Sequence, residues 1–310
     1  MTATTQSPAQ SEVEESDPLG GGIVDTLIGF AHQDVRASHQ QILDQTRDRE
    51  SREAFSTPVQ YMFKETPELE GQSATPEGAV EATLREMGRF GVAVGLVALR
   101  DPLAQEAVTR YPERFVGSWS VDPNEGVQGL RDLVAAHARW GMKAITFFPC
   151  GTSPQVPIDD RKAYPYYARA VELGLPVLVN AGIPGPRVPS DAQRVERIEQ
   201  VLYDFPELVF VTRHGCEPWV DHIVKLMVKW PNLHYSTTAF APRYYPQAII
   251  DYANTRGADR VLYGGYYPMG LSLERITSEL RALPLRSDVW PKFLRTNAER
   301  ILGLDPAAGS

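Results

Sequence analysis

Residues 208–215 read Leu-Val-Phe-Val-Thr-Arg-His-Gly, an apolar run rich in valine that ends in a histidine and a glycine. The following stretch, 218–229, carries apolar residues at helical spacing. A short buried strand that leads directly into a helix is one unit of a parallel sheet with crossover helices. The same unit should therefore recur along the chain.

It recurs from residue 23 to the C-terminal region. The apolar runs lie at 23–28, 92–99, 115–120, 143–148, 176–180, 208–214, 233–237 and 260–264. Helix-like segments between and after them cover 76–90, 102–111, 127–140, 164–173, 192–203, 218–229, 246–256 and 271–283. Eight strand-and-helix units in a chain of 310 residues predict the α/β class and a single (β/α)8 TIM barrel.

The predicted barrel spans residues 21–304. An acidic stretch, 1–20, is expected to be a disordered leader, and 305–310 is a short tail. Segment 31–75 is polar and then rich in Pro, Gly and Ser, so we expect an insertion after the first strand that lies over the barrel mouth. A closing helix over 289–302 is expected to cap the barrel.

Charge and composition exclude several classes of partner. The chain has 31 Lys+Arg and 39 Asp+Glu, a net charge of −8, which argues against nucleic acid and anionic membranes. No apolar run approaches the ~20 residues of a membrane helix, and the N-terminus lacks the pattern of a secretory signal. We expect a cytoplasmic protein. Cys150 and Cys216 are too few for a cysteine-rich zinc site and are expected to be buried.

Polar residues at the carboxyl ends of the predicted strands are the candidate catalytic groups. His214 is expected to act as general base, and Asp25 to orient it or to take a proton itself. Asn180 and Tyr266 could donate hydrogen bonds to an oxyanion. The alternatives are a hydrogen-bonded core histidine, a buried acid satisfied by its neighbours, and polar residues that merely fill the lumen.

Loops at the same end supply candidate substrate-binding residues. Arg187 and Arg243 could each clamp a carboxylate or phosphate, or could be solvated. Three aromatic residues are expected to line the pocket or to pack between sheet and helices: Phe148, Trp219 and Tyr267. Strand alternation turns Arg213 to the face opposite His214, so we interpret Arg213 as structural.

Four motifs, in order along the chain, carry a family resemblance. They are 176–185 (PVLVNAGIPG), 214–219 (HGCEPW), 260–269 (RVLYGGYYPM) and 297–304 (NAERILGL). With these motifs the sequence resembles the amidohydrolase-related barrels, in the branch that includes aminocarboxymuconate-semialdehyde decarboxylase. The resemblance covers residues 23–304 and implies a hydrolase or carboxy-lyase that forms a homodimer or homotetramer.

The resemblance also implies a metal site that this chain does not reproduce. The first strand of the family reads Asp-x-His-x-His, where this chain has Leu27 and Gly29 in place of both histidines. Asn180 replaces a ligand histidine, Tyr266 replaces a ligand aspartate, and only His214 is retained. Leucine and glycine offer no donor atoms, and amide and phenol are poor ligands. The sequence therefore predicts no metal and no other cofactor.

We expect an enzyme that acts on a small carboxylated or cyclic metabolite by metal-independent acid–base chemistry. One alternative is a non-catalytic ligand-binding or partner subunit that has kept the barrel. Another is a relocated metal held by Asp25, His32 and His214. A catalytic site would hold His214 within hydrogen-bond reach of Asp25 or Tyr266 with a perturbed pKa, whereas a scaffold would have an apolar, filled barrel top.

Overall fold

The computed structural model describes residues 17–30, 40–54, 76–269 and 271–304. Most of the predicted leader, the tail, and His32 in the predicted insertion lie outside these residues. Within the described ranges, no helix is both long enough and apolar enough to cross a membrane.

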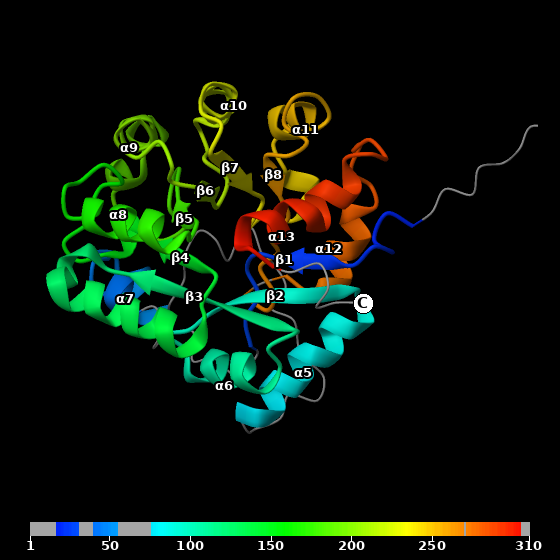
Figure 1. The fold of residues 1–310 in the computed structure, drawn as a ribbon, viewed down its shortest axis with the longest axis horizontal. Coiled ribbons are helices and arrows are strands. Elements are labelled where there is room, and N and C mark those ends of the chain that lie inside the picture. The colour runs from blue at the N-terminus through cyan, green and yellow to red at the C-terminus, as the bar shows by residue number, and fades with distance from the viewer. Residues whose placement is uncertain (1–16, 31–39, 55–75, 270, 305–310) are drawn as a thin grey trace, which may run out of the picture.

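Eight parallel strands form one curved sheet, and each strand pairs with the next along the chain. They are β1 (Ile23–Asp25), β2 (Val92–Ala98), β3 (Phe115–Val121), β4 (Ala144–Phe147), β5 (Val177–Asn180), β6 (Phe210–Arg213), β7 (Leu233–Ser236) and β8 (Val261–Leu262). Helices lie on the outside of the sheet (Figure 1). This architecture confirms the predicted TIM barrel.

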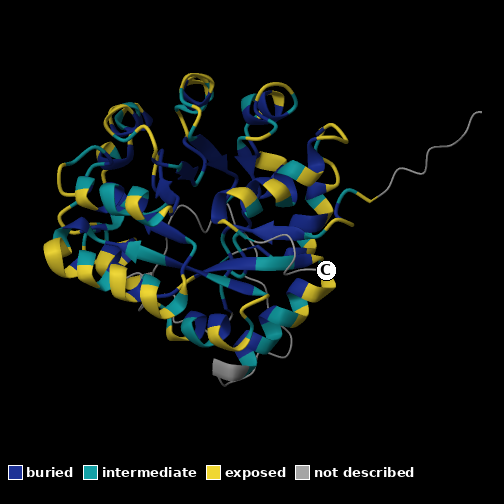
Figure 2. Ribbon diagram, viewed as in Figure 1, coloured by how far each residue is buried: buried dark blue, intermediate teal, exposed yellow. Residues whose placement is uncertain are grey.

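The helices follow the strands as predicted. They are α5 (Pro76–Arg89), α6 (Pro102–Arg110), α7 (Gly126–Trp140), α8 (Tyr164–Leu173), α9 (Ile198–Asp204), α10 (Val220–Lys229), α11 (Gln247–Ala253), α12 (Leu273–Leu280) and α13 (Asn297–Leu302). The described part of the predicted insertion contains α2 (Gln40–Leu43) and α3 (Arg49–Ala54). Figure 2 shows that the helices are exposed only on their outer faces.

Local sequence signals explain where helices begin and end. At α6, the Asp101 carboxylate accepts a hydrogen bond from the Leu103 amide, and Pro102 is the first helical residue. At the end of α7, Gly141 adopts a left-handed φ of 57°, which costs glycine little. The predicted helix over 192–203 is shorter, because two 3₁₀ turns precede α9.

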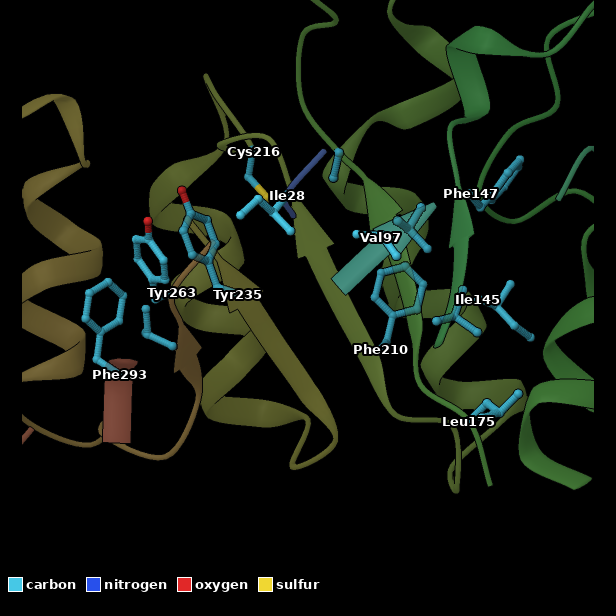
Figure 3. Packing of buried hydrophobic residues seen from close by; sticks show 14 of the residues in the cluster. Ile28, Val97, Ile145, Phe147, Leu175, Phe210, Cys216, Tyr235, Tyr263 and Phe293 are labelled. Atoms are coloured by element: carbon cyan, nitrogen blue, oxygen red, sulfur yellow. The ribbon is translucent and has the colours of Figure 1, made fainter. Parts of the chain in front are cut away.

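Alternating side chains divide the sheet into two faces. One face packs against the helices and includes the labelled residues Val97, Ile145, Phe210, Tyr235 and Tyr263 of Figure 3. The other face points into the barrel. We call its apolar part the lumen cluster: Val24, Leu96, Ala144, Leu178, Val211 and Leu262, together with Ala298, Ile301 and Leu302 of α13.

Helix α13 closes the amino end of the barrel. Val116 and Val209, at the starts of their strands, pack against the lumen cluster that α13 completes. The Lys143 ammonium, just before β4, donates to the Gly303 carbonyl at 3.3 Å. The predicted capping helix is thus confirmed, although a π-helical turn, η6 (Lys292–Thr296), precedes α13. Polar groups in the lumen gather at the opposite, carboxyl end of the strands.

Candidate active site

The carboxyl ends of β5 and β6 bring Asn180 and Arg213 together. The two residues are register partners in the parallel ladder. Each lies two residues beyond a member of the lumen cluster, Leu178 and Val211 respectively, so alternation directs both side chains into the lumen. Phe210, of opposite parity, packs against Tyr167 of α8 at a centroid distance of 6.5 Å.

This arrangement corrects the interpretation of Arg213 as a residue on the other face. Arg213 is 9% exposed, and its Nε has no hydrogen-bond partner within the described residues. Burial lowers the pKa of Arg213 to about 10, and Tyr266 is the group that opposes this shift. The guanidinium therefore stays charged at neutral pH. Counting alternation from Val211 would have found this residue in the sequence.

His214 follows Arg213 and leaves the strand geometry. Its φ is 64°, and its amide donates to the Thr238 hydroxyl at 3.1 Å. The imidazole packs edge-to-face against Tyr266, with ring centroids 5.7 Å apart, and Nδ1 has no partner in the described part of the chain. Burial, and then the charge of Arg213, lowers the pKa of His214 to about 3. His214 is therefore neutral at pH 7, whereas the sequence led us to expect a histidine that titrates near neutral pH.

Tyr266 is half-buried beside His214. Burial raises the pKa of Tyr266, while the positive charge of Arg213 acts in the opposite direction. Its phenol is protonated at neutral pH and can donate a hydrogen bond or a proton. The sequence led us to expect His214 within hydrogen-bond reach of Asp25 or Tyr266, and the structure places the His214 and Tyr266 rings in edge-to-face contact.

Hydroxyl groups line the lumen between these residues and the lumen cluster. The Thr26 and Ser236 hydroxyls are hydrogen-bonded at 2.9 Å, and the Ser120 and Thr146 hydroxyls at 2.8 Å. The carboxyl end of the barrel is therefore polar. A pure scaffold was expected to have an apolar barrel top, and these hydroxyl groups are polar.

Asp25 occupies a different position from the one predicted. Strand β1 ends at Asp25, and Val24, not Asp25, belongs to the lumen cluster. Asp25 has the parity of Ile23, which packs toward the helices. Its Oδ1 accepts hydrogen bonds from the amides of Leu27 at 2.9 Å and Gly265 at 2.8 Å. The carboxylate therefore joins β1 to the segment after β8.

The other oxygen of Asp25 lies in the layer between sheet and helices. A Cβ built on Gly265 would be 2.6 Å from Asp25 Oδ2 and 2.9 Å from the Tyr263 hydroxyl. Tyr263 packs against Phe293, as Figure 3 shows, with centroids 6.0 Å apart. Burial raises the pKa of Asp25 to about 7, against the lowering effect of its two backbone hydrogen bonds. Asp25 accepts a hydrogen bond from the amide of Gly265, the residue before Tyr266. It could therefore hold Tyr266 in position although its own side chain lies outside the lumen.

The two candidate arginines are engaged with carboxylates. Arg187 Nη1 lies 2.7 Å from Asp48 and 2.9 Å from Glu50, which fastens the loop after β5 to the insertion. Arg243 lies 3.5 Å from Glu279 of α12 and is 56% exposed. Their predicted substrate contacts remain predictions. Both guanidiniums are ion-paired, whereas Arg213 has no ion pair within the described residues.

The three candidate aromatic residues differ in placement. Phe148 follows β4 with the parity of Ala144 and packs on Gly151. Trp219 is half-buried under Arg194, whose guanidinium lies 5.7 Å from the ring. Tyr267 is 1% exposed in the helix-facing core, and burial, then Glu86 of α5, raises its pKa to about 12. Tyr267 is thus a packing residue, because its parity turns it toward α5.

The donor set at the carboxyl end does not fit a divalent cation. Within the described residues, no group of three or more His, Cys, Asp or Glu side chains is close enough to hold a metal ion. Asp25 directs one oxygen to backbone amides and the other to the helix layer. The positions beside His214 hold a guanidinium and a protonated phenol, and a fixed positive charge disfavours a second cation. His32, from the alternative site, lies outside the described residues.

Comparison with known proteins agrees with this architecture. The family model described as "Amidohydrolase" matches residues 63–304. No curated protein matches the sequence. An uncharacterized TIM-barrel protein from Bordetella bronchiseptica is 25% identical, with a TM-score of 0.69 over 93% of this chain and 99% of that chain.

Two similar structures are of named enzymes. A 5-carboxyvanillate decarboxylase from Novosphingobium aromaticivorans is 17% identical, with a TM-score of 0.65 over 92% of this chain and 98% of that chain. That structure holds manganese and 3-methoxy-4-hydroxy-5-nitrobenzoic acid. A 4-oxalomesaconate hydratase from Rhodopseudomonas palustris is 18% identical, with a TM-score of 0.59 over 92% of this chain and 97% of that chain. These likenesses establish the fold.

Proposed function

The chain belongs to the amidohydrolase family, and we propose that it acts on a small carboxylated or cyclic metabolite by metal-independent acid–base chemistry. It is an enzyme of the hydrolase or carbon–carbon lyase class. The observation that carries the proposal is the pairing of His214 with Tyr266 beside a buried cation, where the family resemblance implies metal ligands. Within the family, we propose that the chain belongs to the branch that includes aminocarboxymuconate-semialdehyde decarboxylase.

In this proposal Tyr266 is the acid and His214 the base. The Tyr266 phenol is protonated and lies at the developing charge of a substrate held at the strand ends. The neutral imidazole of His214 accepts a proton through Nδ1, which has no partner in the described residues. Asn180 adds a neutral donor and acceptor. Asp25 is a positioning residue, because its hydrogen bond to the Gly265 amide fixes the backbone next to Tyr266.

Among the residues that the structure describes, the lack of a fitting donor set supports the metal-independent part of the proposal. Asn180 and Tyr266 stand where the family resemblance implies a histidine and an aspartate. Arg213 is the register partner of Asn180 and interacts electrostatically with Tyr266. Proton transfer, enolisation, dehydration and ring closure need no metal when an acid and a base are held in place. As further parts of the proposal, the enzyme is cytoplasmic and forms a homodimer or homotetramer.

The test is turnover of a panel of small aromatic and aliphatic carboxylates by chelator-treated protein. We expect activity to persist after chelation and to fall by about 10²-fold or more in His214→Asn and in Tyr266→Phe. His222→Asn and Tyr244→Phe are matched controls, because both residues are exposed on the surface. Activity that disappears with chelation and returns with manganese or zinc would refute the metal-independent mechanism.

A further inference from the structure

We propose that Arg213 is the anion-binding residue of this site, and that the substrate presents a single carboxylate to it. The proposal rests on the proposed function in that both concern the carboxyl end of the lumen. It deepens that function by assigning the residue that binds the carboxylate of the substrate and by requiring that group. The starting observation is a buried guanidinium that no carboxylate neutralises.

No acidic side chain in the described ranges forms an ion pair with Arg213, although 18 ion pairs are present elsewhere. Asp25, which lies on the first strand, is turned to Gly265 and Tyr263. A buried cation without a partner is costly, so proteins rarely keep one without an occupant. A substrate anion would supply the missing negative charge.

Neighbouring groups are arranged to receive such an anion. Asn180 is the register partner of Arg213 and carries an amide that can donate. Tyr266 interacts with Arg213 electrostatically and is half-buried, as is His214. These three side chains are neutral, so the site offers several hydrogen-bond donors and one positive charge.

The charge of the site favours a monoanion. A carboxylate carries one negative charge and accepts two parallel hydrogen bonds from a guanidinium. A phosphate or sulfate dianion would leave one negative charge buried without compensation. The inferred ligand class is therefore a small monocarboxylate whose remaining atoms extend toward Tyr266 and His214.

Calorimetric titration of the full chain with formate, acetate and benzoate tests this inference, with formamide, acetamide and benzamide as neutral matches. We expect at least one carboxylate to bind and its amide not to bind. Arg213→Met should weaken that binding about tenfold or more. Arg213→Lys should retain part of it, because charge remains while the paired donors are lost. Arg100→Met is the control, since Arg100 is already paired with Glu125 at 2.9 Å.

Several results would overturn the inference. They are no binding of any carboxylate to the wild-type protein, equal binding of acid and amide, unchanged binding in Arg213→Met, or tighter binding of sulfate or phosphate. Binding is measured without turnover and without added metal. Activity that requires a metal would thus refute the proposed mechanism while leaving the anion site intact, and loss of anion binding alone would refute only the anion site.

Discussion

Asn180 and Arg213 face each other across the ladder between β5 and β6, at the point where both strands open into the polar end of the lumen. One residue is a neutral amide at a position where the family resemblance implies a metal ligand, and the other is a buried cation. Their adjacency means that the positive charge of this site is part of the polypeptide. In the proposed mechanism this charge takes the place of a metal ion.

Replacing Arg213 should stabilise the protein. The guanidinium is buried without a carboxylate partner, and removing an uncompensated buried charge with an apolar side chain of similar length relieves its desolvation cost. We expect Arg213→Met to increase the free energy of unfolding by on the order of 1–3 kcal/mol. Such a gain is typical when a residue that is kept for function at a cost in stability is replaced. Urea denaturation measures this. A destabilised variant would mean that Arg213 has a structural role instead.

Asp25 should make stability depend on pH. Its folded pKa, about 7, lies above 3.8, the ordinary value of an aspartate, so the folded state binds more protons between these values. The stabilisation is complete below about pH 4 and is lost as pH rises through 7. Asp25→Asn keeps an acceptor for the Gly265 amide and removes the titration. We expect the variant to gain stability relative to wild type from pH 5 to 8, by at most a few kcal/mol.

The control for this experiment is the way in which the stability difference between Asp25→Asn and the wild type changes with pH. The gain of Asp25→Asn should vanish below about pH 3, where the wild-type carboxyl is protonated in both folded and unfolded states. A constant difference between the two proteins at all pH values would contradict the raised pKa of Asp25.

Gly265→Ala should disturb the seam between β1 and β8. A Cβ at this position would be 2.6 Å from Asp25 Oδ2 and 2.9 Å from the Tyr263 hydroxyl, so the side chains must move apart. We expect a loss of about 1–3 kcal/mol in the free energy of unfolding. Gly88→Ala, on the exposed side of α5 with no atom within 4 Å, is the matched control and should stabilise by about 0.5–1 kcal/mol. Thermal unfolding of both variants decides the matter, and an unaffected Gly265→Ala would speak against a tightly packed seam.

Arg187→Ala should loosen the described part of the insertion. Arg187 holds Asp48 and Glu50 at 2.7 and 2.9 Å, and its side chain is 31% exposed. Because partly exposed ion pairs contribute little to global stability, we expect a change of less than about 1 kcal/mol in unfolding. Hydrogen exchange of the amides in α3 should nevertheless become faster. Unchanged exchange in α3 would show that other contacts hold this segment.

The barrel could be predicted from the sequence because its signal is repeated eight times. Each run of valine, isoleucine and phenylalanine reports burial on both faces of a parallel strand, and each following segment reports an amphipathic helix. Strand ends were less well defined. The run at 23–28 forms a strand only to Asp25, and the run at 260–264 only over Val261–Leu262.

The orientation of single residues at those ends could not be predicted as well. Alternation counted from Asp25 to Gly29 assumed a strand that continues, whereas Val24 and Thr26 face the lumen. At β6, alternation from His214 placed Arg213 on the wrong face, because the φ of 64° at His214 interrupts the strand. The lumen residue Val211 was the correct reference. The sequence also could not show which arginines are neutralised by a carboxylate, because ion pairs such as Arg187 with Asp48 join residues far apart in the chain.

Elemental analysis of the protein purified without chelators or added metal tests the central claim most directly. The account predicts far less than one manganese, zinc or iron ion per chain, with no difference between the wild type and His214→Ala. About one ion per chain in the wild type, lost in His214→Ala, would contradict it and would make the metal the source of the positive charge at this site.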